Sequence, residues 1–396
     1  MDNLIMESKV LNIDKSNWKL TKLGDLLEDI SQRVDNPSKS GYDRFVGLEH
    51  FVSGDIKIKN WGTTENLTSS TKAFKAGDIL FARRNAYLRR ASLVDFDGCC
   101  SGDAFVLREN HVKVVPGFMA FFFNSNTVWD FANENAAGTM SQRVKWRDLA
   151  EYEFLLPPKD EQARLAELLW SLDEVIEKEK EVLERLEINL DVRGSHLIWN
   201  EENRMEEVVK FASANLKKFV DGDWIESKDQ SDSGIRLLQL ADIGVREFIN
   251  KSSRFISEET FKRLRCFEVL PNDVLIARMP DPIGRACIIE NIGHKMITAV
   301  DCCIVRVESS HSYNRYLLHL LNTREFLHKA NLLASGTTRQ RIARKSLEEI
   351  KVPKPSLECQ FKIANELDSL YEIIGLNRAK IRSSESLQKS LINQIF

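Results

Sequence analysis

The sequence has no apolar run that approaches the ~20 residues a helix needs to cross a bilayer. Its first residues also lack the basic stretch followed by an apolar stretch that marks a secretory signal. Apolar residues make up 43% and charged residues 29% of the 396 positions, which is typical of a soluble globular protein with two or three domains. We therefore expect a cytoplasmic protein with no membrane partner.

Cysteine is scarce, with seven residues in the chain, and none of them stands in a C-x-x-C pair. No histidine lies at ligand spacing from a cysteine, so the sequence predicts no metal site. Two adjacent pairs, Cys99–Cys100 and Cys302–Cys303, lie in apolar segments. We expect buried free thiols and no disulfide framework.

The sequence also lacks the patterns that carry common chemistry. No G-x-x-x-x-G-K-[ST] loop is present, which excludes the usual phosphate-binding loop. Neither a glycine-rich turn for S-adenosylmethionine nor the Asn/Asp-Pro-Pro-aromatic run of adenine methyltransferases occurs, because Pro157–Pro158 is followed by Lys159. We expect no catalytic residue and no cofactor in this chain.

Charge is distributed unevenly. The formal net charge of −3 would disfavour a nucleic-acid partner, but the acidic residues are concentrated in 159–207. Residues 31–150 and 208–350 each contain more Lys and Arg than Asp and Glu. The placement of the arginines in these two blocks therefore decides whether a nucleic-acid partner is plausible.

The two basic blocks are copies of one another. Residues 137–152, AGTMSQRVKWRDLAEY, and residues 335–350, SGTTRQRIARKSLEEI, match at a spacing of 198, half the length of the chain. Asp103 matches Asp301 at the same spacing, and Gln162 matches Gln360. Upstream, AGDILFAR at 76–83 matches PNDVLIAR at 271–278. Such internal similarity predicts two domains of one fold.

Each copy has the same order of predicted elements. Alternating apolar residues and glycine-containing turns predict strands, and an apolar stripe at three- and four-residue spacing predicts a helix. A Gly-Thr turn, a short helix and a proline segment follow. The strands are expected at 45–61, 78–83 and 104–109, with the helix at 117–134; in the second copy they are expected at 235–249, 273–278 and 302–308, with the helix at 313–330. This order predicts a mixed α/β fold, present twice.

Beyond the prolines, each copy continues as a long helix, at 159–207 and 356–396. Apolar residues alternate at four- and three-residue steps, which predicts a coiled-coil seam. Two independent surface helices are the alternative, but the equal phase and length of the patterns favour pairing. The expected seam positions are Leu165, Leu169, Leu172, Ile176, Glu179, Leu183, Leu186 and Leu190, and Ile363, Leu367, Leu370, Ile374, Asn377, Ile381 and Ser384. The polar Glu179 and Asn377 interrupt the two seams at the same step, so we expect them to fix the register.

Arginines follow the strand at 78–83. The loop RRNAYLRR brings four of them together, and in the second copy Arg278 and Arg285 match Arg83 and Arg90. Like charges at this density repel one another, and a guanidinium group pairs well with phosphates and guanine edges. We expect DNA contacts from Arg83, Arg84, Asn85, Arg89, Arg90, Arg278 and Arg285. A solvated loop paired with acids such as Asp95 and Asp97 is the alternative.

The Gly-Thr turn is the second candidate for DNA contact. If the Gln-Arg pair that follows it lies in the first turn of a helix, the unpaired N–H groups there would suit a phosphate. Gln can read adenine and Arg can read guanine, whereas plain helix capping is the alternative. The candidate residues are Gln142, Arg143 and Lys145 in the first copy, and Arg339, Gln340, Arg341, Arg344 and Lys345 in the second.

This order of features resembles the specificity subunit of a type I restriction–modification system. The resemblance extends over the chain from about Trp18 and lies in the strands ending in arginine, the Gly-Thr turns and the helices after the prolines. One departure concerns the loop after the strand. The family commonly has glycines there, and the second copy has Gly284, but the first has Arg89.

The resemblance implies target-recognition domains at 1–158 and 208–355, each reading one half of an interrupted double-stranded DNA site. The helices at 159–207 and 356–396 would form an antiparallel coiled coil that sets the spacer. The chain itself would have no catalytic activity. Two modification subunits would methylate adenine N6 with S-adenosylmethionine, and restriction subunits would use ATP and Mg.

Other functions stay open at this point. The chain could be the recognition subunit of a related methyltransferase–nuclease defence system. It could also be an enzyme with an unrecognised site, or a coiled-coil scaffold that does not bind DNA. Activity of the isolated chain would favour the enzyme, and failure of an assembled complex to bind any duplex would favour the scaffold.

Overall fold

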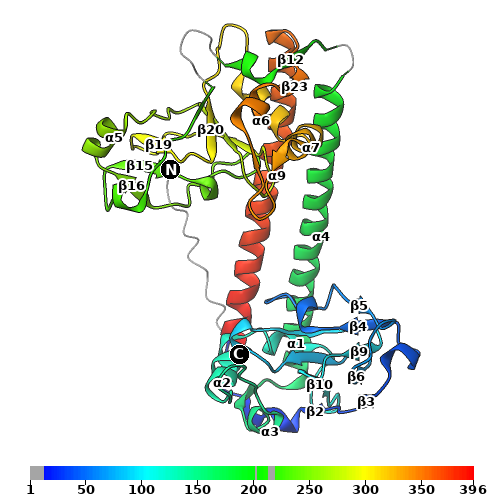
Figure 1. Ribbon diagram of the computed structural model, residues 1–396. Helices are drawn as coiled ribbons and strands as arrows, with labels where there is room; N and C mark the ends of the chain where they lie inside the picture. The colour runs from blue at the N-terminus through cyan, green and yellow to red at the C-terminus, as the bar shows by residue number, and fades with distance from the viewer. Residues whose placement is uncertain (1–12, 201–202, 213–218) are drawn as a thin grey trace. The chain divides into compact units, whose positions relative to one another are not determined.

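The computed structural model describes residues 13–200, 203–212 and 219–396 (Figure 1). The expectation about a secretory signal falls on residues 1–12, outside the described residues. The chain forms two compact units, Met1–Glu181 with Ala379–Phe396, and Val182–Arg378. These units differ from the expected division into four segments, because each contains one globular part together with half of each long helix.

Unit 1 contains three sheets. A central four-stranded sheet has the order β2-β10-β7-β8, a five-stranded sheet has the order β3-β6-β9-β4-β5, and β1 pairs with β11. The strands are β1 (Lys19–Lys22), β2 (Leu27–Asp29), β3 (Arg33–Val34), β4 (Arg44–Val46), β5 (Gly62–Thr63), β6 (Thr71–Phe74), β7 (Ile79–Ala82), β8 (Ala91–Leu93), β9 (Gly98–Cys100), β10 (Ala104–Glu109) and β11 (Glu153–Leu156). Strand β7 is buried along its whole length, and Phe81 within it stacks on Trp129 with ring centroids 4.6 Å apart. The core of unit 1 therefore lies between the central sheet and the helices beside it.

Unit 2 repeats this central sheet in the order β13-β20-β17-β18. The register also repeats, because Leu80 pairs with Val106 in unit 1 and Leu275 pairs with Ile304 in unit 2. The other sheets are β14-β16-β15-β19, β12-β23 and β21-β22. The strands are β12 (Met205–Glu207), β13 (Phe219–Asp221), β14 (Gln230–Ser231), β15 (Ile235–Leu238), β16 (Arg254–Ile256), β17 (Val274–Ala277), β18 (Ala286–Ile288), β19 (Met296–Thr298), β20 (Cys302–Val305), β21 (Ala334–Ser335), β22 (Arg341–Ile342) and β23 (Lys351–Pro353). The predicted duplication of a mixed α/β fold is confirmed.

The single helix predicted in each copy is wrong, because two helices occupy the segment. They are α1 (Phe118–Phe122) and α2 (Asn126–Glu134) in unit 1, and α6 (Asn314–Leu321) and α7 (Arg324–Leu332) in unit 2. An asparagine lies just beyond the first helix of each pair. The Asn322 side chain donates to the carbonyl oxygen of Ala286 at 3.0 Å and accepts from its N–H at 3.1 Å, while Asn124 donates to the Ala120 carbonyl at 3.0 Å. The apolar stripe continues across the break, which is why the pattern alone suggested one helix. The remaining short helices are α3 (Trp146–Leu149), α5 (Glu258–Leu264) and α8 (Arg344–Glu348).

The two long helices, α4 (Lys159–Ile198) and α9 (Leu357–Ile395), are antiparallel in each unit. In unit 1, Gln388 donates to Asp173 at 3.1 Å and Lys180 pairs with Glu385 at 2.9 Å. In unit 2, Arg378 pairs with Glu187 at 2.6 Å and Arg193 with Glu366 at 2.5 Å. In both units, residues of increasing number along α4 contact residues of decreasing number along α9. The predicted antiparallel pairing is confirmed.

The predicted seam positions are buried or half-buried along both helices. Glu179 is buried, lies 3.0 Å from the Lys380 ammonium group, and accepts a hydrogen bond from Ser384 at 3.2 Å. Among the described residues, the buried side-chain oxygen of Asn377 has no hydrogen-bond partner. A polar atom without a partner in a seam costs stability. That Glu179 and Asn377 fix the register stays a prediction.

The central helix is shorter than the predicted 159–207. It ends at Ile198, and Met205–Glu207 forms β12, which pairs antiparallel with β23. The starts of the long helices are fixed by matching glutamines, both fully buried. Gln162 accepts from the Val115 N–H at 3.0 Å, and Gln360 accepts from the Tyr313 N–H at 2.9 Å. Each glutamine therefore joins a helix to its globular part.

Within the described part of the chain, no helix is both long and apolar enough to cross a membrane. The same residues contain no group of His, Cys, Asp and Glu that could hold a metal ion. All seven cysteines are free, and six of them are buried. The expectation of buried thiols is confirmed for those six, whereas Cys359 is half-buried.

Candidate nucleic-acid interface

The arginine loop of unit 1 begins where β7 ends and runs to the start of β8. Asn85 and Arg89 have positive φ angles of 55° and 48°, and the short 3-10 helix Ala86–Leu88 lies between them. Because residues with side chains rarely adopt this conformation, the loop has a defined shape that its neighbours must stabilise. Tyr87 lies within this loop and is 64% exposed.

The Gly-Thr turn is a hairpin and not the start of a helix, so the helix N-terminus predicted there is wrong. Ala137 and Arg143 exchange backbone hydrogen bonds of 3.1 and 3.0 Å across the turn. In unit 2 the corresponding residues form β21 and β22. The helices α3 and α8 begin only at Trp146 and Arg344. The Gln-Arg pair therefore does not lie in the first turn of a helix, where unpaired backbone N–H groups could bind a phosphate.

Backbone hydrogen bonds join the arginine loop and the Gly-Thr turn in both units. In unit 1 the Val144 N–H donates to the Arg83 carbonyl at 2.9 Å, and the Asn85 N–H donates to the Gln142 carbonyl at 2.9 Å. In unit 2 the Ile342 N–H donates to the Arg278 carbonyl at 3.0 Å. The two segments that the sequence singled out separately thus form one surface in each unit.

An aspartate missed by the sequence reasoning organises this surface. Asp103 accepts from Arg143 at 2.8 and 3.2 Å, and the Arg83 and Arg84 guanidinium groups lie 3.8 Å from it. The hydrogen bond from Arg143 lowers the pKa of Asp103, which keeps the carboxylate charged. In unit 2, Arg341 lies 3.2 Å from Asp301. The match between the two aspartates at a spacing of 198 was the available signal.

Arg90 and Arg285 have internal roles, and the expectation that they contact DNA needs correction. Arg90 donates to the Leu48 and Arg84 carbonyls at 2.9 and 3.2 Å. Arg285 is 7% exposed and donates to four carbonyl oxygens, among them Leu240 at 3.1 Å. Burial lowers the pKa of both arginines. Their guanidinium groups stabilise the loop from inside, because their N–H groups donate to backbone carbonyl oxygens.

Two further arginines are also used internally. Arg278, 6% exposed, pairs with Asp221 and donates to the Ile342 carbonyl at 3.1 Å. Arg89 donates to Asn126 at 2.6 Å and to Asp130 at 3.0 Å on α2. We therefore leave Arg278 and Arg89 out of the interface. In both cases an aspartate distant in sequence pairs with the positive charge of the arginine.

The remaining candidates are accessible to different degrees. Arg344 pairs with Asp221 at 3.1 Å and Glu348 at 2.5 Å, and like Arg143 and Arg341 it stays half-buried. The other candidate residues are exposed or half-buried and lie on or next to the joined loop and turn. We call them the candidate DNA face: Arg83, Arg84, Asn85, Gln142 and Lys145 in unit 1, and Arg339, Gln340 and Lys345 in unit 2.

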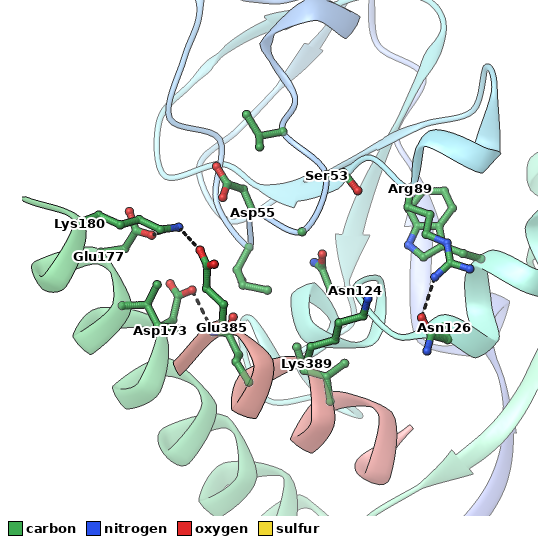
Figure 2. A pocket seen from close by; sticks show the side chains of 17 residues that line it. Ser53, Asp55, Arg89, Asn124, Asn126, Asp173, Glu177, Lys180, Glu385 and Lys389 are labelled. Carbon is green, nitrogen blue, oxygen red and sulfur yellow. Dashed lines mark hydrogen bonds and ion pairs between the residues drawn. The ribbon is translucent and has the colours of Figure 1, made fainter. Parts of the chain in front are cut away.

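Unit 1 also contains a cavity of about 370 Å³ lined by residues 52–56, Asn124 and both long helices, with Lys389 on α9 (Figure 2). Arg89 lines it beside Asn126, to which it donates (Figure 2). In unit 2, Arg246 contacts Asn322 and Asp191, the residues that match Asn124 and Lys389 at the spacing of 198. Its guanidinium group donates to the carbonyl oxygen of Asn322 at 3.0 Å, and to Asp191 at 3.2 Å. The two globular parts are therefore attached to the helices by different contacts.

Comparison with known proteins identifies the family. The family model for the type I restriction modification DNA specificity domain matches residues 15–187 and again residues 207–384. The chain belongs to this family. It is a DNA sequence-recognition subunit of the type I restriction–modification kind, as the resemblance implied, and specificity subunits are themselves non-catalytic.

Similar specificity subunits come from bacteria and archaea. The putative type I restriction enzyme MjaX specificity subunit of Methanocaldococcus jannaschii is 23% identical over 416 residues, covering 95% of this chain and 92% of that protein. The EcoDI specificity subunit of Escherichia coli is 25% identical over 169 residues, covering 41% of this chain and 37% of that protein.

Solved structures share the fold. A chain from the structures of type I restriction–modification complex assembly and conformational transition has a TM-score of 0.60 at 21% identity, covering 95% of this chain and 96% of that chain. The type I specificity subunit from M. genitalium has a TM-score of 0.57 at 16% identity, covering 96% of each chain.

Proposed function

We propose that each unit of this specificity subunit reads one half of a bipartite, interrupted DNA site through its candidate DNA face. The observation that supports this most directly is the repetition of the joined loop and turn. Arg143 with Asp103 and Arg341 with Asp301 form ion pairs at the same place in the repeat. A protein that reads two short sequences with two copies of one fold needs such a repeated frame.

The paired helices α4 and α9 set the number of base pairs between the two half-sites in this proposal. Each helix runs continuously from one unit into the other, and a helix is a stiff spacer with a fixed rise per residue. The acidic character of 159–207 supports this role, because acidic residues do not bind the phosphate backbone.

The proposed partners supply the chemistry. Two modification subunits methylate adenine N6 with S-adenosylmethionine, and restriction subunits use ATP and Mg to translocate and cut DNA. The specificity chain binds the double-stranded DNA and the modification subunits in the cytoplasm, where the genome lies.

Methylated adenines in the source genome test this function. We expect a two-part motif, with a fixed number of unspecified base pairs between its halves, to be methylated in the parent strain. Deleting the gene for this chain should abolish methylation at that motif, and restoring it should return the same motif. Unchanged methylation after the deletion would contradict the proposal.

A further inference from the structure

The Gly-Thr turns of the two units share a frame. Each begins at a glycine with positive φ, +126° for Gly138 and +108° for Gly336. A Cβ atom on either glycine would meet the carbonyl oxygen of the residue three positions on, 3.1 Å away at Ser141 and 2.7 Å away at Arg339. The two backbones therefore fold back in the same way, and corresponding residues occupy corresponding places.

Residues that are identical in the two units cannot distinguish two different half-sites. Gln142 and Gln340 are the same residue and are both exposed. Arg143 and Arg341 are also the same, and each pairs with an aspartate of its own unit. Any difference in sequence preference must arise from positions at which the turns differ.

The turns differ at their tips. Unit 1 has Met140 and Ser141 there, and unit 2 has Thr338 and Arg339. Met140 is 96% exposed, although a large apolar side chain gains free energy when it is removed from water. Arg339 is exposed as well. One tip therefore offers an apolar surface, and the other offers five N–H donors.

The loop beside the tip of unit 1 adds to its apolar surface. Tyr87 and Leu88 are 64% and 40% exposed, and the hydrogen bond from the Asn85 N–H to the Gln142 carbonyl joins their loop to the turn. In unit 2 the residue that matches Leu88 is Ile283, which is buried. Lys145, exposed nearby on the turn of unit 1, supplies positive charge for a phosphate backbone.

We infer that these tips carry the discrimination between the half-sites. Met140 contacts the C5-methyl group of a thymine in the half-site read by unit 1. Arg339 donates to O6 and N7 of a guanine in the other half-site. Both contacts lie in the major groove, where the thymine methyl group and the guanine acceptors are displayed. The inference rests on the proposed function, because it names the bases that the candidate DNA face reads.

Exchange of the tips provides the main experiment. The full chain, assembled with its modification subunits, selects duplexes from a library randomised in both half-sites. The variant Met140→Thr/Ser141→Arg should remove the thymine preference from the first half-site, add a guanine preference there and leave the second half-site unchanged. The reciprocal variant Thr338→Met/Arg339→Ser should change only the second half-site.

Removal of a single methyl group tests the contact itself. Replacing the selected thymine by uracil should weaken binding of the wild-type complex by about fourfold, which corresponds to one buried methyl group. The same replacement should not affect a Met140→Ser variant, which has no methyl group at the tip. Met140→Leu is the matched control, because it keeps an apolar tip and should keep the thymine preference. Since Met140 and Arg339 are exposed, the Met140 variants and the unit 2 exchange should melt at the wild-type temperature. Ser141→Arg removes the hydroxyl that accepts from Arg84 at 3.1 Å, so the melting temperature of the unit 1 exchange is measured beside its selected sequences.

The outcomes separate the two proposals. If the tip exchanges leave both half-site preferences unchanged, or abolish both with the melting temperature unaltered, the tips do not discriminate and this inference fails. If the wild-type complex selects no two-part sequence, the proposed function itself fails.

Discussion

Arg143 donates two hydrogen bonds to Asp103, from Nε to Oδ1 at 2.8 Å and from Nη2 to Oδ2 at 3.2 Å. Asp103 precedes β10, and Arg143 lies in the Gly-Thr hairpin 40 residues later in the chain. A planar guanidinium group paired at two points fixes both distance and orientation. The pair therefore holds the hairpin against the central sheet. In unit 2, Arg341 and Asp301 form an ion pair at the same place, with Nε 3.2 Å from Oδ1. This division between supporting and exposed residues determines what mutations should do.

Replacing both Gln340 and Arg341 with alanine should abolish discrimination at one half-site and leave the other half-site read normally. Each lost base contact should cost ~1–3 kcal/mol. Gln340→Ala alone should weaken discrimination at that half-site rather than abolish it, because Arg339 keeps its own contact, and should leave the melting temperature unchanged. Arg341→Ala should also lower the melting temperature, because Asp301 loses its partner. Binding of the assembled complex to duplexes varied in one half-site at a time measures the effect. Equal losses at both half-sites would show that these residues only support the fold.

The salt dependence of DNA binding should separate phosphate contacts from internal arginines. Sequence reasoning predicts that neutralising two of the four loop arginines flattens the slope of log K against log[salt] by roughly 2 units. The structure makes the prediction specific. Neutralising Arg84 and Lys145, on the candidate DNA face, should produce this change, because each would release counterions from DNA.

Arg90→Gln is the matched control for the salt experiment. Arg90 donates to the Leu48 carbonyl, so its replacement should lower the melting temperature and leave the salt slope as it is. Titrations of the complex with a duplex at several salt concentrations measure both variants. An unchanged slope after neutralising Arg84 and Lys145 would mean that this face does not meet the DNA backbone.

Stability should depend on pH through Asp223 in unit 2. Burial raises the pKa of its carboxyl group to about 6, above the ~3.9 expected of an unfolded chain. The folded state therefore binds this proton more tightly, and stability should fall as pH rises between these two values. Asp223→Asn removes the charge and keeps an oxygen that can accept from the Phe267 N–H.

Thermal unfolding at several pH values tests this prediction. Asp223→Asn should be more stable than the wild type at pH ~7.5, and the difference should shrink towards pH ~3, below both pKa values, where the wild-type carboxyl group is mostly protonated in both states. Asp232→Asn, at an exposed position of the same unit, is the control and should show no such dependence. A variant that is less stable at every pH would contradict the account.

Lengthening both long helices should lengthen the DNA spacer. Insertions must face one another, and Glu179 faces Lys380 while Lys180 faces Glu385. Adding one heptad after Glu181 and one after Lys380 should therefore preserve the seam better than insertions after Ile176 and Ile374, which lie at different levels. Seven residues add ~10 Å at ~1.5 Å each, or roughly 3 base pairs at ~3.4 Å.

Methylation mapping with the lengthened chain checks this. The half-site sequences should stay the same, while the original spacing ceases to be methylated and a longer one replaces it. If the rotation about the DNA axis is too large to absorb, methylation is lost at every spacing. A heptad in α4 alone is the control and should weaken pairing, because it shifts one seam against the other. Continued methylation at the original spacing would mean that the helices do not set it.

The antiparallel pairing of the long helices was implied by the resemblance to type I specificity subunits. The residues alone predicted the duplicated fold and the coiled-coil seams. Both depend on repetition: the spacing of 198 residues between Asp103 and Asp301, and the four- and three-residue steps of the seam through Leu169 and Ile374. Such periods follow from which residues must share a face, so they can be read without knowing the partners. The sequence did not predict the break between the two helices at Asn124, because the apolar stripe continues past the point where the backbone turns.

Tertiary structure alone decided which of the candidate residues support the fold. Arg90 and Arg84 lie in one loop and have the same charge, yet Arg90 donates to two backbone carbonyls, one of them Leu48, 42 residues away, while Arg84 donates to the Ser141 hydroxyl at the edge of the turn. The Gly-Thr turn forms a hairpin for a similar reason. The Val144 N–H donates to the carbonyl oxygen of Arg83, which lies far upstream in the sequence. Hydrogen bonds between distant segments leave no period in the sequence, and a guanidinium group suits an internal carbonyl as well as a DNA phosphate.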